Sequence, residues 1–374
     1  KQDVNNQIAK QENSAIPSWV QSLKIKGDVR LRYQTQQKEG STTRNRGRVR
    51  YRLGVEGKPN DKFVVGAGLS SAEKNSSTDD PRSTNQTMDE GFNRGDLRLD
   101  YAYGEYKPNS WLSLIGGKYN AGGKGYLWYT TDMMWDSDIN QEGVSVHADL
   151  AKVLKGEAFV NAGYWVIEES SSSATDIGMY YAQAGLGHSL DVGLEEPFKT
   201  KLAGTFYGVQ GLEETNALID GRSSGNTVSG TKYVYDWGQV WAGSAEVVYN
   251  WPEETSSPIK MAGVFADYVM NPDPGSDNTG WASGLKFGHK KVGAQRGDWQ
   301  FKYQYVRLAK DAWLDAFPDS DRYSGNTNVK SHEWILDIGL SKNVSLGLDY
   351  YRSDALKGTK ADEQIFQADV VMKF

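Results

Sequence analysis

The sequence predicts an all-β protein: a transmembrane antiparallel up-and-down β-barrel of about 16 strands, with 18 as the alternative count. Three observations support this. Apolar and polar residues alternate in segment after segment of the 374 residues. Short and long connections between these segments take turns. Tyrosine and tryptophan recur near segment ends, which suits membrane interfaces, although any half-buried strand favours these rings.

The alternation is clearest in the first predicted strand. From Leu23 to Tyr33 every odd position is apolar or Gly, and every even position carries Lys, Asp or Arg. A period of two places the two sets on opposite faces of a strand, whereas a helix would scatter both around its axis. Segment 44–57 repeats the pattern, with arginine at every second position of its central part.

Later segments follow the same rule. In 94–107, Leu97, Leu99, Tyr101 and Tyr103 are expected to share the apolar outer face. Segments 110–120, 156–167 and 259–270 alternate less strictly. The sixteen predicted strands are 22–36, 44–57, 62–72, 94–107, 110–120, 142–150, 156–167, 178–189, 199–210, 238–250, 259–270, 280–290, 297–309, 330–341, 343–353 and 363–374.

The connections alternate in length. Short ones contain the Pro, Asn or Gly that tight turns need, as in 57–61, 107–110 and 341–343. The long polar connections are 72–93, 120–141, 211–237 and 309–329. An up-and-down membrane barrel has short turns at one rim and long loops at the other, and a soluble sandwich has no reason to sort its loops in this way.

Composition excludes several classes of protein. A hydrophobic content of 38% and a mean hydropathy of −0.63 suit a soluble chain, but a barrel hides its lipid-facing residues at every second position. The centre is then expected to be water rather than an aliphatic core. A net charge of −6 argues against a nucleic-acid partner. The absence of cysteine excludes disulfides, thiolate metal sites and cysteine-based catalysis.

The N-terminal residues stand apart from this pattern. Residues 1–18 do not alternate, and Pro17 separates them from the first strand. They are expected to form an N-terminal periplasmic segment, either a short helix or a disordered stretch. Residues 19–374 are expected to form the barrel.

Three stretches carry a family resemblance. They are the opening Ile25-Lys26-Gly27-Asp28-Val29-Arg30-Leu31-Arg32-Tyr33, the alternation from Phe366 to the final Phe374, and Gly116-Gly117-Lys118-Tyr119 with Asp132, Asp136 and Glu142-Gly143-Val144. They resemble Gram-negative outer-membrane porins, in particular a group distantly akin to the phosphate-selective porins.

The resemblance implies a homotrimeric, water-filled channel of 16 or 18 strands in the bacterial outer membrane, with the third long loop, about 120–141, folded inward. It implies contact with membrane lipids and lipopolysaccharide, and passage of small polar solutes or ions. Phe374 is similar to the C-terminal signal that the outer-membrane assembly machinery recognises.

The polar faces of the strands suggest the lining of the pore. Because an Arg or Lys near the bilayer midplane costs roughly 2–4 kcal/mol, the charged face must point inward. The basic wall is then expected to consist of Arg30, Arg32, Arg46, Arg48, Arg50, Arg52 and Arg98. Acids of the third loop, Asp132, Asp136, Asp138 and Glu142, are expected to face it and to set up a transverse field across a constriction.

No catalytic residue, metal or cofactor is expected. Asp136, Asp138 and Asn140 begin like a calcium-binding loop, but Gln141 replaces its sixth-position glycine and His147 its final glutamate. A solvated acidic loop is the preferred interpretation. Two other functions stay open: a barrel serving as a sleeve for a partner such as an electron-conduit cytochrome, and a secreted carbohydrate-active β-protein.

Overall fold

The structure is a computed structural model that describes residues 17–73, 80–92, 94–152, 157–171, 175–212, 218–219, 224–252, 254–359 and 361–374. Of the predicted N-terminal segment, residues 1–16 lie outside the described residues, and Pro17 precedes the one-turn helix α2 (Ser18–Gln21). Among the described residues, no helix is long and apolar enough to cross a membrane.

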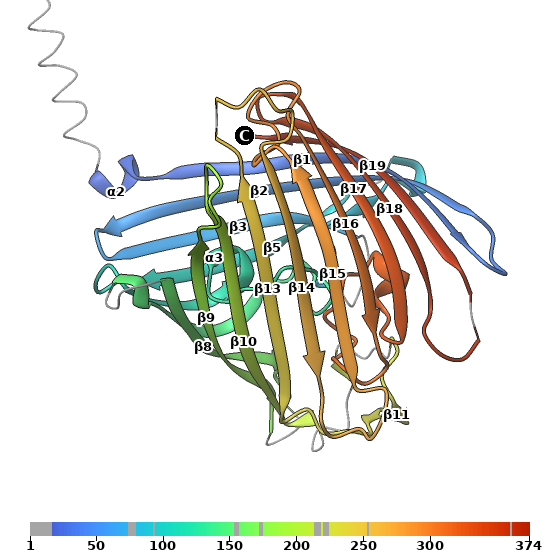
Figure 1. The fold of residues 1–374 in the computed structure, drawn as a ribbon. Helices are drawn as coiled ribbons and strands as arrows, with labels where there is room; N and C mark the ends of the chain where they lie inside the picture. The colour runs from blue at the N-terminus through green and yellow to red at the C-terminus, as the bar shows by residue number, and fades with distance from the viewer. Residues whose placement is uncertain are drawn as a thin grey trace, which may run out of the picture.

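Sixteen long strands in the described residues form one closed antiparallel sheet (Figure 1). Each pairs with the next along the chain, and the last pairs with the first, with Arg32 opposite Asp369. They are β1 (Lys24–Lys38), β2 (Arg44–Asn60), β3 (Phe63–Ala72), β5 (Asp96–Tyr106), β6 (Leu112–Tyr119), β7 (Gln141–Asp149), β8 (Glu157–Glu168), β9 (Ile177–Leu190), β10 (Phe198–Gln210), β13 (Val240–Asn250), β14 (Met261–Met270), β15 (Thr279–Gly288), β16 (Trp299–Leu308), β17 (Val329–Ser341), β18 (Val344–Ala355) and β19 (Glu363–Lys373). The predicted fold class and strand count are confirmed.

The remaining described elements are short and lie in the connections. They are β4 (Gln86–Thr87), which pairs with β2, the hairpin β11 (Val228–Ser229) and β12 (Lys232–Tyr233), the helix α3 (Ala121–Lys124), and the 3₁₀ turns η1 (Glu90–Phe92), η2 (Leu150–Lys152) and η4 (Arg322–Gly325). The α3 turn begins at Asn120, whose side chain accepts the Gly123 N–H at 2.5 Å, as N-caps do.

The two faces of the strands are sorted as the alternation predicts. On β1, Ile25, Leu31 and Tyr33 are 67%, 45% and 52% exposed on the outside. Asp28 and Arg32 are buried on the inside. The outer surface is apolar because it faces lipid, and the inner surface carries the charge.

One prediction about side-chain direction is wrong. Leu69 of β3 pairs with Leu99 of β5, but the preceding Gly68 pairs with Tyr101, so Asp100 is an extra residue in the ladder. Such a β-bulge shifts the alternation by one position. Leu97 and Leu99 face outward as predicted, whereas Tyr101 and Tyr103 face the lumen.

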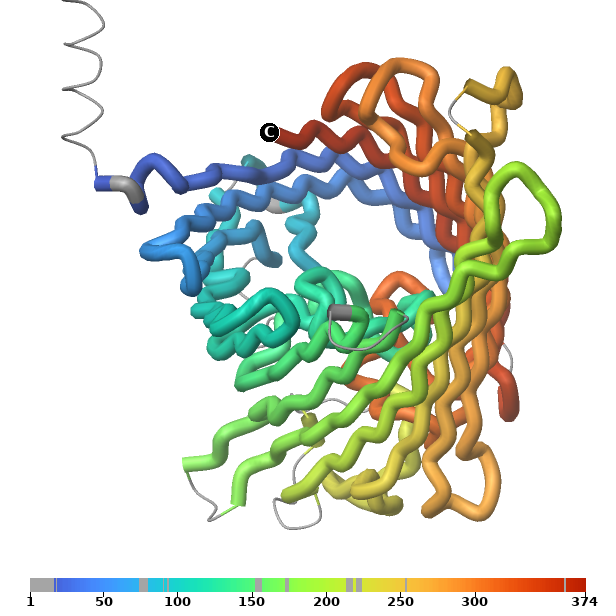
Figure 2. The backbone as a smooth tube through the Cα atoms, turned by 60° about the vertical axis from the view of Figure 1, so that its left-hand side comes forward, coloured from blue at the N-terminus to red at the C-terminus, as the bar shows by residue number. Residues whose placement is uncertain are grey.

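The barrel interior is also not purely aqueous, contrary to the prediction. The third loop (120–140, between β6 and β7) and the β16–β17 loop (309–328) fold into it. Trp135 of the third loop stacks on Phe317 of the β16–β17 loop, with ring centroids 4.8 Å apart, and meets Trp165 of the wall edge-on at 5.5 Å. Figure 2 shows both loops, teal-green and orange, within the ring of strands. An aromatic core therefore anchors the two loops to each other and to the wall.

Candidate functional site: the lumenal constriction

Six arginines on the lumen side of two neighbouring strands form a basic surface, termed the arginine wall: Arg30 and Arg32 of β1, and Arg46, Arg48, Arg50 and Arg52 of β2. In the register of these strands Arg30 lies opposite Arg50, and Arg32 lies opposite Arg48. Neighbouring strands are only about 4.8 Å apart. Like charges directly opposite one another are unfavourable, so the wall needs counter-charges.

Strand carboxylates supply the first of these counter-charges. Asp28 accepts the Nε–H of Arg50 at 2.9 Å and that of Arg52 at 2.8 Å. Arg32 forms a bidentate pair with Asp369 of β19, both contacts being 2.8 Å. Bidentate contacts fix the plane of a guanidinium as well as its charge. These arginines are therefore held rigidly against the barrel wall.

Loop residues supply further partners. Arg30 donates to the side-chain oxygen of Asn85 at 2.6 Å, and Arg48 lies 3.4 Å from a carboxylate oxygen of Glu73. Arg32 also reaches Asp321 of the β16–β17 loop at 2.9 Å. The long loops thus cover part of the arginine wall on its lumen side.

Some donors of the wall stay unused among the described residues. The guanidinium of Arg46 forms no hydrogen bond or ion pair with any residue that the structure describes. The Nε atoms of Arg30, Arg46 and Arg48 are buried and have no described hydrogen-bond partner. A buried guanidinium with free N–H groups is a ready donor for an anion or an ordered water.

Arg98 extends the wall on β5. It lies in register with Ser70 of β3, which in turn pairs with Arg52. Its guanidinium lies 3.8 Å from Asp96. Arg98 is therefore a lumenal residue two strands from the wall, in line with Arg52.

The third loop is fastened on the opposite side of the barrel. The buried Asp267 of β14 accepts the backbone N–H of Thr131 at 2.6 Å and its hydroxyl at 2.7 Å. It also accepts the N–H of Thr130 at 3.1 Å. The loop thus starts beside β6 and is attached on β14, which makes it span the lumen.

Among the four predicted loop acids, Asp138 alone contacts the arginine wall within the described residues. It lies 3.3 Å from Arg52 and accepts the hydroxyl of Thr84 at 3.1 Å. Asp136 instead accepts two backbone N–H groups, of Asp138 and Ser320, both at 2.9 Å. Asp136 thus links the third loop to the β16–β17 loop.

Asp132 belongs to a separate buried cluster. Arg322 of η4, itself only 2% exposed, lies 2.5 Å from Asp132, 2.7 Å from Glu333 of β17 and 3.5 Å from Asp319. Gln304 of β16 donates to both Asp132 and Glu333. This cluster locks the tip of the third loop to the β16–β17 loop and to the wall.

The loop carboxyls differ in the direction in which their pKa is shifted. Burial together with Asp319 and Asp138 raises the pKa of Asp136 well above its usual value. Burial and Asp132 likewise raise the pKa of Asp319. Burial acts in the same direction on Asp132, but the charges of Arg322 and Lys302 and the hydrogen bonds from Arg322 and Gln304 together outweigh it and lower the Asp132 pKa.

Glu142 lies apart from the constriction. It forms an ion pair with Lys118 at 2.8 Å and its side chain is 60% exposed. It shares a strand face with Val144, which is 57% exposed on the outside. The structure therefore places this predicted constriction acid on the outer face of the barrel.

Neither acidic group fits a metal site. Ligand oxygens of Asp132, Asp319 and Glu333 lie within 4.8 Å of one another, but the guanidinium of Arg322 already supplies their counter-charge. The weak candidates Asp136, Asp138 and Asn140 do not converge, since Asn140 donates to Asp100 at 2.9 Å while Asp138 is engaged by Arg52.

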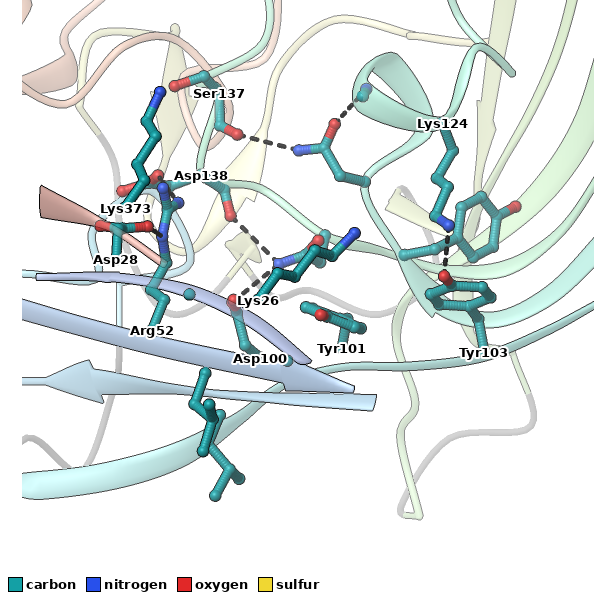
Figure 3. A pocket seen from close by; sticks show the side chains of 18 of the residues that line it. Lys26, Asp28, Arg52, Asp100, Tyr101, Tyr103, Lys124, Ser137, Asp138 and Lys373 are labelled. Carbon is teal, nitrogen blue, oxygen red and sulfur yellow. Dashed lines mark hydrogen bonds and ion pairs between the residues drawn. The ribbon is translucent and has the colours of Figure 1, made fainter. Parts of the chain in front are cut away.

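A cavity of about 660 Å³ opens beside the constriction at the short-turn end of the barrel (Figure 3). It is bounded by the first strands and the third loop. The lining side chains that matter here are Lys26, Asp28, Arg52, Asp100, Tyr101, Tyr103, Lys124, Ser137, Asp138 and Lys373. Charged groups and phenol rings thus share one water-accessible space.

Phe374 completes the seam of the barrel. Its backbone exchanges two hydrogen bonds with Gly27, of 3.0 and 3.1 Å. Its ring lies so close to Gly27 that a Cβ there would be 2.6 Å from it. The ring is on the outer face, 55% exposed.

The sequence analysis did not predict several residues of this site. Asp28 and Asp369 follow from the same alternation that selects the arginines, since both lie on charged strand faces. Asp321, Arg322 and Glu73 lie in or beside long loops, where no periodicity marks a direction. Their roles depend on tertiary contacts alone.

Comparisons with known proteins agree with this architecture. The family model described as "Putative porin" matches residues 37–235 and 233–374. The chain belongs to this porin family. The comparison with curated protein sequences finds no match.

Solved porin structures share the fold. The high-pH structure of Pseudomonas putida OprB superposes on this porin with a TM-score of 0.61 and 11% identity, covering 95% of each chain. Salmonella typhi OmpF, in a complex with daunomycin, has a TM-score of 0.57 and 11% identity, covering 94% of this porin and 97% of OmpF. At this identity the likeness shows the fold alone. Family and fold together place the porin in the bacterial outer membrane as a channel.

Proposed function

We propose that this porin is a passive diffusion channel for small hydrophilic solutes and ions, narrowed where the arginine wall faces the third loop. The single observation that carries the proposal is the contact between Arg52 of the wall and Asp138 of the loop, at 3.3 Å. It brings opposite charges of the wall and the loop together beside the 660 Å³ cavity. Solutes passing this point cross a strong transverse field.

The same residues favour anions over cations. Asp28 and Asp369 are each shared by guanidinium groups of the wall, and Arg46 has no partner among the described residues. The loop acids Asp132 and Asp136 are turned toward the β16–β17 loop instead. The wall therefore presents a net positive charge to an ion that passes through the lumen.

Single-channel recording on a triple variant, Arg48→Ala, Arg50→Ala and Arg52→Ala, tests this. Under a KCl gradient the reversal potential is expected to shift toward the cation limit, and conductance to rise because three long side chains are gone. The matched control removes three exposed lysines of the short turns, Lys62, Lys291 and Lys342. Unchanged conductance and reversal potential in the triple variant would reject the constriction.

The sleeve function is less well supported. The third loop and the β16–β17 loop already occupy part of the lumen and are fixed there by the Arg322 cluster and the aromatic core. A partner chain would have to displace them. Co-purification of a stoichiometric second protein, together with little conductance, would favour the sleeve.

The assembly is proposed to be a homotrimer in contact with membrane lipids and lipopolysaccharide. The outer strands carry the exposed apolar residues that lipids or a second copy would cover. Phe374, exposed at the seam between β1 and β19, is proposed as the residue that the assembly machinery reads. Crosslinking in native membranes would report the number of copies.

A further inference from the structure

A flat aromatic surface lies on the lumen side of the first strands. Lys26, Gly54, Gly68 and Tyr101 occupy one row across β1, β2, β3 and β5. A Cβ at Gly68 would lie 2.4 Å from the Tyr101 ring, and one at Gly54 would overlap its hydroxyl. The two glycines therefore let the ring lie down over β3 and β2 and point its hydroxyl toward β1.

The next row repeats the arrangement. Gly66 leaves room for the ring of Tyr103, since a Cβ there would be 2.5 Å from that ring. The rings of Tyr101 and Tyr103 are 5.9 Å apart and inclined by 33°. Tyr103 is held in place, since its hydroxyl donates to Glu56 at 2.7 Å and Lys124 lies over its ring. The hydroxyl of Tyr101 forms no hydrogen bond with any described residue.

Two lysines, Lys26 and Lys373, border the same cavity. Lys373 of β19 lies opposite Asp28 of β1, and Lys26 is two residues away on β1, so the two lysines are diagonal neighbours across the seam. Diagonal neighbours lie roughly 7–8 Å apart. Neither ammonium group forms a hydrogen bond or ion pair with any residue that the structure describes.

The carboxylates of the cavity are engaged. Asp28 is shared by Arg50 and Arg52, Asp100 accepts from Asn140 at 2.9 Å, and Asp138 accepts from Thr84 and pairs with Arg52. A cation would find Asp28 and Asp138 already paired with guanidinium groups. An anion over Tyr101 would find the ammonium group of Lys26, which lies in the same row, whereas Figure 3 shows the Lys373 side chain pointing away from that of Lys26.

We propose that this cavity is a binding subsite for small carboxylates that carry a planar ring, such as an aromatic acid. The ring stacks on Tyr101 and the carboxylate lies beside Lys26, in the same row. The cavity volume of about 660 Å³ is within the usual range for small-ligand sites, about 300–1,000 Å³. This inference rests on the proposed channel function, because a solute reaches the cavity through the lumen.

Saturation-transfer NMR on the folded, detergent-solubilised chain tests the subsite without requiring conduction. Sodium benzoate is the probe. Acetate lacks the ring, benzyl alcohol lacks the charge, and protein-free micelles measure partition into detergent. Benzoate is expected to bind saturably and both analogues to bind more weakly, since an aromatic pair contributes enough to change affinity roughly threefold to tenfold.

Matched variants separate the two contributions. Tyr101→Ala is expected to weaken benzoate binding roughly threefold to tenfold, and Tyr101→Phe to retain it because the hydroxyl has no described partner. Lys26→Gln is expected to abolish the preference over benzyl alcohol, and Lys26→Arg to keep it. Circular dichroism and heat-modifiable migration confirm that each variant is folded.

The outcomes distinguish the subsite from the channel. The subsite is overturned if the unaltered protein does not bind benzoate, or if Tyr101→Ala and the Gln variant bind it as tightly as the unaltered protein does. This holds even where KCl conductance is normal. Binding with the expected pattern but without KCl conductance supports the subsite and rejects the channel.

Discussion

Arg322 shows how one loop residue can organise a lumen. Its guanidinium is buried among Asp132, Glu333 and Asp319, which belong to the third loop, the barrel wall and the β16–β17 loop. Removing one partner from a buried ion cluster leaves uncompensated charge and is strongly destabilising. The position of both loops should depend on this one side chain.

Arg322→Met is expected to destabilise the packed state of the two loops by about 3–5 kcal/mol. The three carboxylates would repel one another once their shared cation is gone. Hydrogen exchange of residues 120–140 and 309–328 measures the effect. Arg352→Met, at a side chain 61% exposed, is the control and should change exchange little; equal protection in both variants would contradict the assigned role.

The carboxyl of Asp319 should make loop packing depend on pH. Its pKa is raised well above the usual 3.8 by burial and by Asp132. At a pH between 3.8 and the raised pKa, Asp319 keeps its proton in the packed loop and has lost it in the open loop. Packing is therefore strongest below the usual pKa and weakens as pH rises through the raised one. The pKa of Asp136 is raised as well, by burial and by the carboxylates of Asp319 and Asp138, so Asp136 adds to the dependence of loop packing on pH.

Asp319→Asn should make the free energy of loop packing depend less on pH. The loss of one titrating proton reduces the slope by up to about 1.4 kcal/mol per pH unit. The neutral amide cannot ionise as pH rises, so the variant gains relative stability on the alkaline side. Hydrogen exchange of the β16–β17 loop, corrected for its intrinsic rate, gives the slope. Asp61→Asn in the β2–β3 turn is the matched control, and an unaltered slope in Asp319→Asn would count against this account.

Sequence alternation predicted the direction of the wall arginines. One face of each strand contacts lipid, so charged side chains must lie on the other face, toward the lumen. The alternation could not predict their partners. Asp321 and Glu73 reach Arg32 and Arg48 from long loops, whose course depends on contacts such as that between Trp135 and Phe317. Glu142 shows the same limit: near the end of a strand, one position decides between lumen and exterior.

At the scale of elements, β5 shows why counting by two can fail. The strand alternates regularly up to Leu99, and the extra residue Asp100 then reverses the phase, which brings Tyr101 and Tyr103 inside. Nothing in the local sequence marks Asp100 as a bulge, since an acidic residue also suits a lumenal position. The bulge became visible only through the pairing with β3.

Deletion of Asp100 should therefore leave the barrel intact. Leu99 and Tyr101 would become consecutive and keep their faces, with loss of the 2.9 Å hydrogen bond from Asn140. Because the chain has no cysteine, a single Cys in place of Tyr101 reports its side by labelling with a water-soluble maleimide. Labelling should persist in the deletion variant.

Deletion of Ala102 is the control for the bulge. It removes a residue from a regular part of the ladder, so the residues on one side of the deletion must change face. Folding, followed by heat-modifiable migration, is expected to fail or slow markedly. The reverse result, in which loss of Asp100 is damaging and loss of Ala102 is harmless, would contradict the assigned register.

At the scale of the whole molecule, the closed sheet and its inner loops form one system. The strand count and the sorting of short turns and long loops were predictable, because lipid requires a closed sheet with one apolar face. The aromatic core inside the barrel was not, since Trp135, Trp313 and Phe317 lie in loops that resemble ordinary polar connections. The lumen is thus narrowed by packed hydrophobic residues as well as by charge.

The central claim is that this narrowed lumen still conducts. Single-channel recording of the unaltered, heat-modifiable protein in a planar bilayer tests it most directly. Discrete, ohmic conductance steps in KCl, with a reversal potential on the anion side under a salt gradient, are the expected result. A folded protein that inserts but gives no steps would contradict the claim.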